Sequence, residues 1–227
     1  MLAAAPDADE VWCLGDVVGY GPDPNECVEL LRGRKLTCVA GNHDLGAIGE
    51  LDLSLFNADA REACEWTARA LSEESRAFLQ SLPRTAVAEH AFLAHGSPRE
   101  PPLEYLLNVD LARPNFEYFS APICLVGHTH VPLVFTRSDE EHGRYRYQTV
   151  VPPIMEAVEL HGLKAIVNAG SVGQPRDGNS DAAYMIFDPE SLTVSQGRVA
   201  YDISITQTRI LDAGLPSRLA ARLSYGW

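Results

Sequence analysis

Paired cysteines, positive charge and long hydrophobic runs are all scarce in this 227-residue sequence. No apolar stretch approaches the roughly 18 residues that a membrane-spanning helix needs, and the start, MLAAAPDAD, lacks the basic leader of a secretory signal. The five cysteines are odd in number and form no CxxC pair, so we expect them to be reduced and buried. These absences predict a cytoplasmic protein without a membrane partner.

Positive charge is too rare for broad binding to polyanions. The 31 acidic side chains outnumber the 18 basic ones and give a formal net charge of -13. This balance disfavours nucleic acid as a partner, although a bound metal could still attract a single phosphate. A chain of this length fits one domain, so we expect a single domain over residues 1–227 that acts on a small substrate.

Apolar runs alternate with helical patterns in the first two thirds of the chain. Runs at residues 10–14 and 36–40 flank a helical pattern at 25–32, and two further helices are expected between 59 and 82. The later part reads mainly as strands, at residues 92–97, 123–130, 132–137, 144–151, 164–171, 183–188 and 193–202. This order predicts an α/β fold in which two β-sheets form a sandwich flanked by helices.

Four segments place metal-binding side chains directly after apolar runs. They are Gly15 and Asp16, Gly41 to Asp44, Ala94 to Gly96, and Gly127 to His130. Alone, each has an ordinary explanation as a turn, a loop or a buried core histidine. Together, each after a strand, they favour a site at one edge of a sheet. Imidazole, carboxylate and amide ligands without thiolate suit Mn, Fe or Zn.

The GHTH segment carries its own prediction. If it is extended, alternate residues point the same way, so His128 and His130 would face two neighbouring ions while Thr129 faces away.

The blocks GDVVGYGPDPNE, GNHD, AHGSP, GHTHVP and NAGSVGQPRDG follow one another along nearly the whole chain. In this order they resemble the signature blocks of calcineurin-like metallophosphoesterases, and the small bacterial phosphodiesterase-like branch in particular. The protein Ser/Thr phosphatases would carry Asp-Arg where Gly19 and Tyr20 stand, and GNHE in place of GNHD. The resemblance implies a four-layer αββα sandwich, in agreement with the strand pattern.

The resemblance also implies a dinuclear metal centre. Asp16 resembles the carboxylate that bridges both ions, Asn42, His95 and His128 resemble the other ligands of the second ion, and His130 resembles a ligand of the first. The implied reaction is hydrolysis of a phosphodiester or phosphomonoester by a metal-bound hydroxide.

Further residues are expected around these ligands. His43 would protonate the leaving oxygen, and Asp44 would hydrogen-bond that imidazole or serve only as a turn residue. Substrate contacts are expected from residues near the strand ends and in the glycine-rich loops, namely Tyr20, Asn168, Ser171 and Arg176. For Arg176 a solvated turn, and for Tyr20 simple packing, remain the alternatives.

One family block is absent from the sequence. Relatives begin with a strand that ends in Asp-x-His and supplies two ligands to the first ion, but no Asp-x-His occurs here. Either the start was set after that strand or the strand was lost, and the uncapped helix formers Leu2 to Ala5 favour the first explanation. The domain is thus expected to be N-terminally incomplete relative to the family. The alternative to a hydrolase is a catalytically impaired module that binds metal or forms a homo-oligomer through unpaired strand edges.

Overall fold

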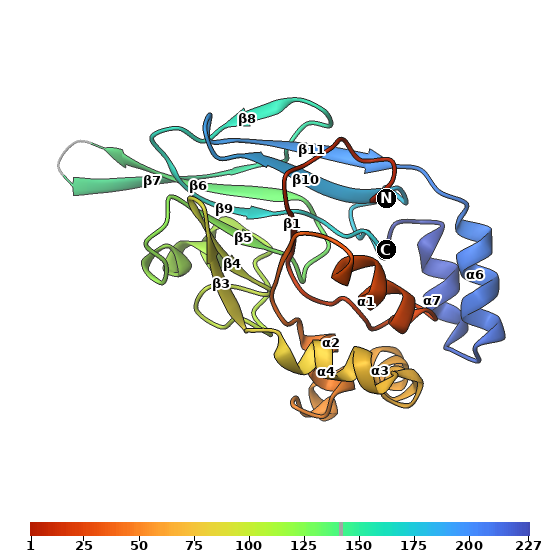
Figure 1. The fold of residues 1–227 in the computed structure, drawn as a ribbon. Helices are drawn as coiled ribbons and strands as arrows, with labels where there is room; N and C mark the ends of the chain where they lie inside the picture. Colours follow the sequence, from red (N-terminus) through yellow and green to blue (C-terminus); the bar gives the residue numbers. More distant parts are fainter. Residues whose placement is uncertain (141–142) are drawn as a thin grey trace.

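The computed structural model describes residues 1–140 and 143–227 and begins with a short strand, helix, strand unit (Figure 1). Strand β1 (Val11–Cys13) lies parallel to β2 (Leu36–Cys38), and helix α1 (Pro24–Arg32) connects them. Pro24 stands in the first turn of α1, where a missing N–H costs no helix bond. Because β1 and β2 are parallel, the loops after both strands leave the same edge of this sheet.

Four helical segments follow, and they are α2 (Asn42–Ala47), the 3-10 helix η1 (Leu53–Leu55), α3 (Ala58–Ala70) and α4 (Glu73–Ser81). The two longer helices match the pair expected between residues 59 and 82. Asn57 caps α3 and Ser72 caps α4, each accepting a bond from a backbone N–H of the first turn. Ala63 and Cys64 lie on the buried face of α3, so the apolar spacing predicted the side that packs inward.

The main sheet has the strand order β3-β4-β5-β9-β6-β7. Its strands are β3 (Thr85–Ala88), β4 (Ala91–Ala94), β5 (Ile123–Val126), β9 (Lys164–Asn168), β6 (Leu133–Glu140) and β7 (Arg144–Val150). Strands β4, β5 and β9 are parallel neighbours, whereas β6 runs antiparallel to β9 and β7. Each of the three parallel strands therefore delivers its following loop to the same edge.

A second sheet, with the order β10-β11-β8, packs over the main sheet (Figure 1). It consists of β8 (Ala157–Glu159), β10 (Ala182–Asp188) and β11 (Thr193–Val199), all paired antiparallel. Buried aliphatic residues such as Leu93, Ile123 and Val194 join the two sheets in one core. The predicted α/β fold, with packed sheets and flanking helices, is confirmed.

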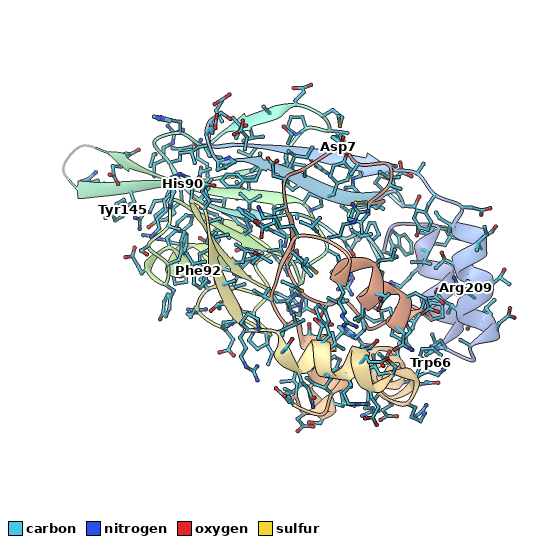
Figure 2. All side chains as sticks on the ribbon, viewed as in Figure 1. Asp7, Trp66, His90, Phe92, Tyr145 and Arg209 are labelled. Carbon is cyan, nitrogen blue, oxygen red and sulfur yellow. The ribbon has the colours of Figure 1, made fainter. Side chains whose placement is uncertain are left out.

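The remaining helices cover other parts of the sheets. Helix α5 (Val109–Ala112) and the 3-10 helix η2 (Arg113–Glu117) belong to a core on the opposite face of the main sheet, which includes Phe116 and Phe135. Helices α6 (Ile203–Asp212) and α7 (Ser217–Leu223) pack together at one end of the molecule, beside Trp66 of α3 (Figure 2). Neither α6 nor α7 was expected from the sequence.

Two local expectations were wrong. Residues 2–4 form a turn, in which Ala4 and Ala5 donate to the carbonyl of Met1, instead of a helix. Cys27 is exposed, although Cys38, Cys64 and Cys124 are buried and none of the five is bonded to another. Among the described residues, no helix is long and apolar enough to cross a membrane.

Candidate metal centre and active site

The ligand loops meet because their strands are parallel. Asp16 follows β1, Asn42 follows β2, His95 follows β4 and His128 follows β5. The backbone links two of these loops directly, since the N–H of Gly127 donates to the carbonyl of His95 over 2.8 Å. The order of strands thus gathers side chains that are more than a hundred residues apart in the sequence.

Four ligand atoms converge on one point of this edge. His95 Nε2 lies 2.9 Å from His128 Nδ1, 3.0 Å from Asn42 Oδ1 and 3.2 Å from Asp16 Oδ2. Asp16, His95 and His128 each offer a ligand atom within 4.8 Å of the others. For ligand bonds of about 2.1 Å at right angles, neighbouring ligand atoms stand about 3.0 Å apart, so this spacing fits a single ion.

The outer hydrogen bonds fix which ring nitrogens carry protons. His95 Nδ1 lies 2.7 Å from the carbonyl oxygen of Leu14, and His128 Nε2 lies 3.2 Å from that of Leu103. A carbonyl only accepts, so these nitrogens carry protons, and the other ring nitrogens, His95 Nε2 and His128 Nδ1, face each other beside Asp16 and Asn42. Two ring nitrogens beside a carboxylate and an amide oxygen form a group of ligand atoms that suits a cation. The residues present therefore fit a divalent metal ion.

The electrostatics of the cluster agree with this assignment. Burial, together with the charge of His95, lowers the pKa of His128 to about 3, so its imidazole is neutral at pH 7 and able to bind metal. Burial opposes the charge on Asp16, but His95 and His43 hold the pKa of that carboxyl well below its usual range. Burial alone would lower the pKa of His95, whereas Asp16 raises it. The net result is a raised pKa for His95, so the cluster favours a positive charge next to the Asp16 carboxylate.

The backbone is unusual at three predicted ligands. Asp16, His128 and His130 have φ angles of 54°, 63° and 62°, a left-handed conformation that few residues other than glycine adopt. The expectation of an extended GHTH segment, with His128 and His130 on one face, was therefore wrong. Buried polar side chains hold the turns of this segment instead. Backbone strain from a left-handed conformation concentrates at functional sites.

Two glycines allow the ligand loops to touch. A Cβ at Gly15 would stand 2.6 Å from the backbone N of Gly41 and 2.9 Å from His95 Nδ1. A Cβ at Gly41 would overlap the carboxylate and backbone nitrogen of Asp16. The loops after β1 and β2 can approach this closely only without side chains at these positions.

His43 lies beside the cluster within an aromatic and sulfur environment. The centre of its ring lies 4.4 Å from that of Tyr20 in a tilted contact and 5.1 Å from that of Phe56 in an edge-to-face contact. Cys64 Sγ lies 3.9 Å from its Nδ1. Its backbone N–H donates to Asp16 Oδ1 over 2.8 Å, which ties the candidate proton donor to the candidate ligand. Burial lowers the pKa of the imidazole.

Asp44 does not hold the His43 ring as predicted. One carboxylate oxygen accepts from the N–H of Val18 at 3.1 Å and the other from that of Gly41 at 2.9 Å. Asp44 is fully buried, and burial together with the charge of Asp16 raises its pKa to about 7 despite these two bonds. Asp44 therefore positions the loops after β1 and β2 around Asp16 and Asn42.

His130 lies outside this group of ligand atoms and contacts Gln174 and Tyr20. Its Nδ1 is 2.6 Å from the carbonyl oxygen of Gln174, and its own carbonyl accepts from the N–H of Arg176. The Arg176 guanidinium donates to the Tyr20 hydroxyl over 3.2 Å and to Gln174 Oε1 over 2.9 Å. Arg176 and Tyr20 thus contact each other beside the ligand loops, and Arg176 is not a freely solvated turn residue.

Asn168 and Ser171 hold backbone rather than line a cleft. Asn168 is fully buried; its Nδ2 donates to Gly127 O and Thr129 Oγ1, and its Oδ1 accepts from the N–H of Gly170. Ser171 Oγ accepts from the N–H of Gln174. Both polar atoms of the Asn168 amide thus have partners within the fold, which favours a positioning role for this side chain over direct contact with substrate.

Comparison with known proteins shows the family of the chain. The calcineurin-like phosphoesterase superfamily domain matches residues 1–192. The chain belongs to this superfamily. The uncharacterized protein MJ0912 of Methanocaldococcus jannaschii is 36% identical over 221 residues, which cover 96% of this chain and 86% of that protein. Membership implies phosphoester hydrolysis and divalent metal ions in general.

Solved structures of similar proteins share the fold. The metallophosphoesterase from Sphaerobacter thermophilus is 42% identical with a TM-score of 0.86, covering 100% of this chain and 91% of that one. Hypothetical protein PH1004 from Pyrococcus horikoshii OT3 is 22% identical with a TM-score of 0.74, covering 97% and 86%, which shows the common fold.

One wall of this candidate site was not predicted from the sequence. The Tyr105 ring lies 3.9 Å from the His128 ring, and Leu103 next to it accepts the His128 proton. Glu104 holds this loop by accepting bonds from Ser97, Arg99 and Asn115. The segment PPLEYLLN offers no periodic pattern or ligand pair, so only the tertiary structure reveals its role.

Proposed function

We propose that this protein hydrolyses small phosphoesters, as a phosphodiesterase or phosphatase, with divalent metal ions such as Mn, Fe or Zn. The observation that carries the proposal is the convergence of Asp16 Oδ2, Asn42 Oδ1 and His128 Nδ1 on His95 Nε2. By contrast, a surface hollow of about 290 Å³ is lined by Glu26, Glu29 and Glu74, whose charges repel phosphate.

The roles of the chain's residues follow from their places around this point. A bound ion supplies positive charge that stabilises the charge developing on the phosphoryl oxygens. His43, adjacent to Asn42 and bonded to Asp16 through its backbone, is the group we assign to protonate the leaving oxygen. Arg176, oriented by Tyr20 and Gln174, is assigned to bind phosphoryl oxygens of the substrate.

Hydrolysis after metal depletion and reloading tests the proposal. Protein stripped with chelator should hydrolyse neither bis(p-nitrophenyl) phosphate nor p-nitrophenyl phosphate, and Mn²⁺ should restore turnover of at least one. His128→Ala should remove this activity, whereas His161→Ala, at an exposed position, should retain it. If the Mn²⁺-loaded protein shows no rate above buffer on either ester, the hydrolase proposal is wrong.

A second candidate function is a metal-binding module without efficient turnover. It is favoured by the position of His130, which is not part of the group of Asp16, His95 and His128. Among the described residues, His130 and Asp16 are then the two candidate ligands for a further ion. Metal content and turnover separate the two candidates, because the module would bind one ion tightly and leave both esters intact.

A further inference from the structure

Two cysteines stand side by side on the strands that precede the first two ligand loops. Cys13, the last residue of β1, lies directly opposite Cys38, the last residue of β2. The strands are hydrogen-bonded at this point, since the N–H of Val39 donates to the carbonyl of Cys13 over 3.1 Å. Two of the five cysteines are therefore neighbours, although helix α1 separates them in the sequence.

Both thiols lie on the same face of this two-stranded sheet. Facing residues of neighbouring strands point to the same side, and successive residues of one strand alternate. Trp12 and Val39 belong to the core between the sheets, so Cys13 and Cys38 point together to the other side. Cys13 is half-buried there and Cys38 is buried. A hydrogen bond with the Cys13 thiol, together with burial, raises the pKa of the Cys38 thiol, which agrees with contact between the two.

The spacing of the pair suits a disulfide. Neighbouring strands lie about 4.8 Å apart, and the Cα atoms of linked cysteines are usually about 4.4–6.8 Å apart. The Cβ atoms of linked cysteines stand closer, at about 3.8 Å. Closing a bond between Cys13 and Cys38 must therefore draw the ends of β1 and β2 together.

The loops after β1 and β2 leave little room for that movement. A Cβ at Gly15 would stand 2.6 Å from the backbone N of Gly41, and one at Gly41 would overlap Asp16. The two loops are thus already in contact at their glycines. Drawing the strand ends together must displace Asp16 relative to Asn42, and displaced ligands hold a metal ion less well.

We propose that Cys13 and Cys38 form a reversible disulfide when the protein meets a peroxide, and that this bond weakens metal binding at Asp16 and Asn42. Cys13, the more exposed thiol, loses its proton and attacks hydrogen peroxide. A sulfur–oxygen bond forms, the O–O bond breaks, and the leaving hydroxide takes up a proton to become water. The Cys38 sulfur then attacks the Cys13 sulfur, and the hydroxyl leaves as water with the Cys38 proton. The two thiols thus lose two electrons, and the peroxide is reduced to water.

Peptide mapping tests for this bond directly. The metal-free Cys27→Ser protein is treated with equimolar hydrogen peroxide, alkylated and cleaved with trypsin. Cleavage after Lys35 places Cys13 and Cys38 on different peptides, and the Cys27 change removes the exposed thiol that shares a peptide with Cys13. The two peptides should be linked, with two hydrogen atoms lost, and should separate after reduction. Absence of this link, or equal linkage of Cys13 to another cysteine, would overturn the inference.

Calorimetric titration with Mn²⁺ tests the consequence for the metal centre, on which this part of the inference rests, without requiring hydrolysis. The oxidised Cys27→Ser protein should bind Mn²⁺ about tenfold more weakly than the reduced protein, and reduction followed by desalting should restore the affinity. Adding Cys13→Ser or Cys38→Ala should abolish this response, whereas adding Cys124→Ser, on β5, should retain it.

Three outcomes would contradict the effect on metal binding. A mapped disulfide without a change in Mn²⁺ affinity, or an equal loss of affinity in Cys13→Ser after peroxide, would overturn it. A reduced protein that binds no Mn²⁺ would contradict the metal centre and this effect together. A mapped bond between Cys13 and Cys38 in a protein that binds Mn²⁺ but hydrolyses neither ester would support the disulfide and contradict only the hydrolase proposal.

Discussion

Gly41 and Asp16 are packed so closely that a methyl group added at Gly41 should weaken both metal binding and the stability of the fold. Gly41 has a φ of -93°, which any residue can adopt, so Gly41→Ala brings steric overlap with Asp16 but no backbone strain. We expect Mn²⁺ affinity to fall at least about tenfold and stability to fall by about 1–3 kcal/mol. Calorimetric metal titration and urea denaturation measure the two effects. Gly33→Ala, whose new Cβ would have ordinary contacts of 3.7 Å, is the matched control.

His43 can be removed without disturbing the ligand that it touches. Its contact with Asp16 is made by the backbone N–H, which alanine retains. His43→Ala should therefore keep bound Mn²⁺ but lower kcat about 10²- to 10⁴-fold on an ester with a poor leaving group, the usual contribution of a general acid. Phenyl and p-nitrophenyl esters should be compared, with metal content measured alongside. Equal losses on both esters would argue against proton donation by His43.

At the scale of elements, Asn168 connects the end of β9 to the loop after β5. Asn168→Ala removes bonds to Gly127 and Thr129 and leaves buried acceptors unpaired, so we expect a loss of about 2–3 kcal/mol in the free energy of unfolding. The turn that aims His128 should loosen, and Mn²⁺ affinity should fall. Asn108→Ala, which removes only the cap of α5, should cost about 1 kcal/mol without affecting metal. A changed KM with unchanged stability and metal affinity would restore a substrate role for Asn168.

Elements with strong local patterns could be predicted from the sequence. The strands before Asp16, Asn42, His95 and His128 are short apolar runs that end in glycine-containing turns, so both the strands and the ligands after them were recognisable. Helix α6 was not recognised because Ile210 is its one fully buried residue and its apolar periodicity is weak. Short β8 was missed because pairing with the distant β11, rather than its own sequence, makes it a strand. Strand β3 forms a tight hairpin with β4, and its four residues are too few to show a clear alternation.

The site's supporting contacts could not be predicted for a related reason. Asp44 and His43 are adjacent in sequence, which suggested a bond between them, yet Asp44 instead accepts from Val18 and Gly41. The left-handed backbone of His128 is imposed by the turn between β5 and β6, not by a preference of histidine. The Tyr105 wall and the bond from Arg176 to Tyr20 join separate segments of the chain. Such contacts follow from the packing of whole elements.

For the whole molecule, we predict that the 227-residue chain binds about one tightly held ion and is stabilised by it. The described residues offer one group with Asp16, His95 and His128, and Asn42 Oδ1 supplies a fourth ligand. A further ion would have only Asp16 and His130, and two ligands rarely hold an ion against water and buffer.

At an Mn²⁺ concentration about 100 times the Kd, the native state gains about 2.7 kcal/mol. That gain raises Tm by about 5–10 °C for a chain of this size. Calorimetric scanning with metal analysis should show this shift and a ratio near one ion per chain. His128→Ala should abolish both, while exposed His161→Ala should preserve them. Two well-occupied ions per chain would contradict this prediction and show that the chain supplies more ligands to a second ion than Asp16 and His130.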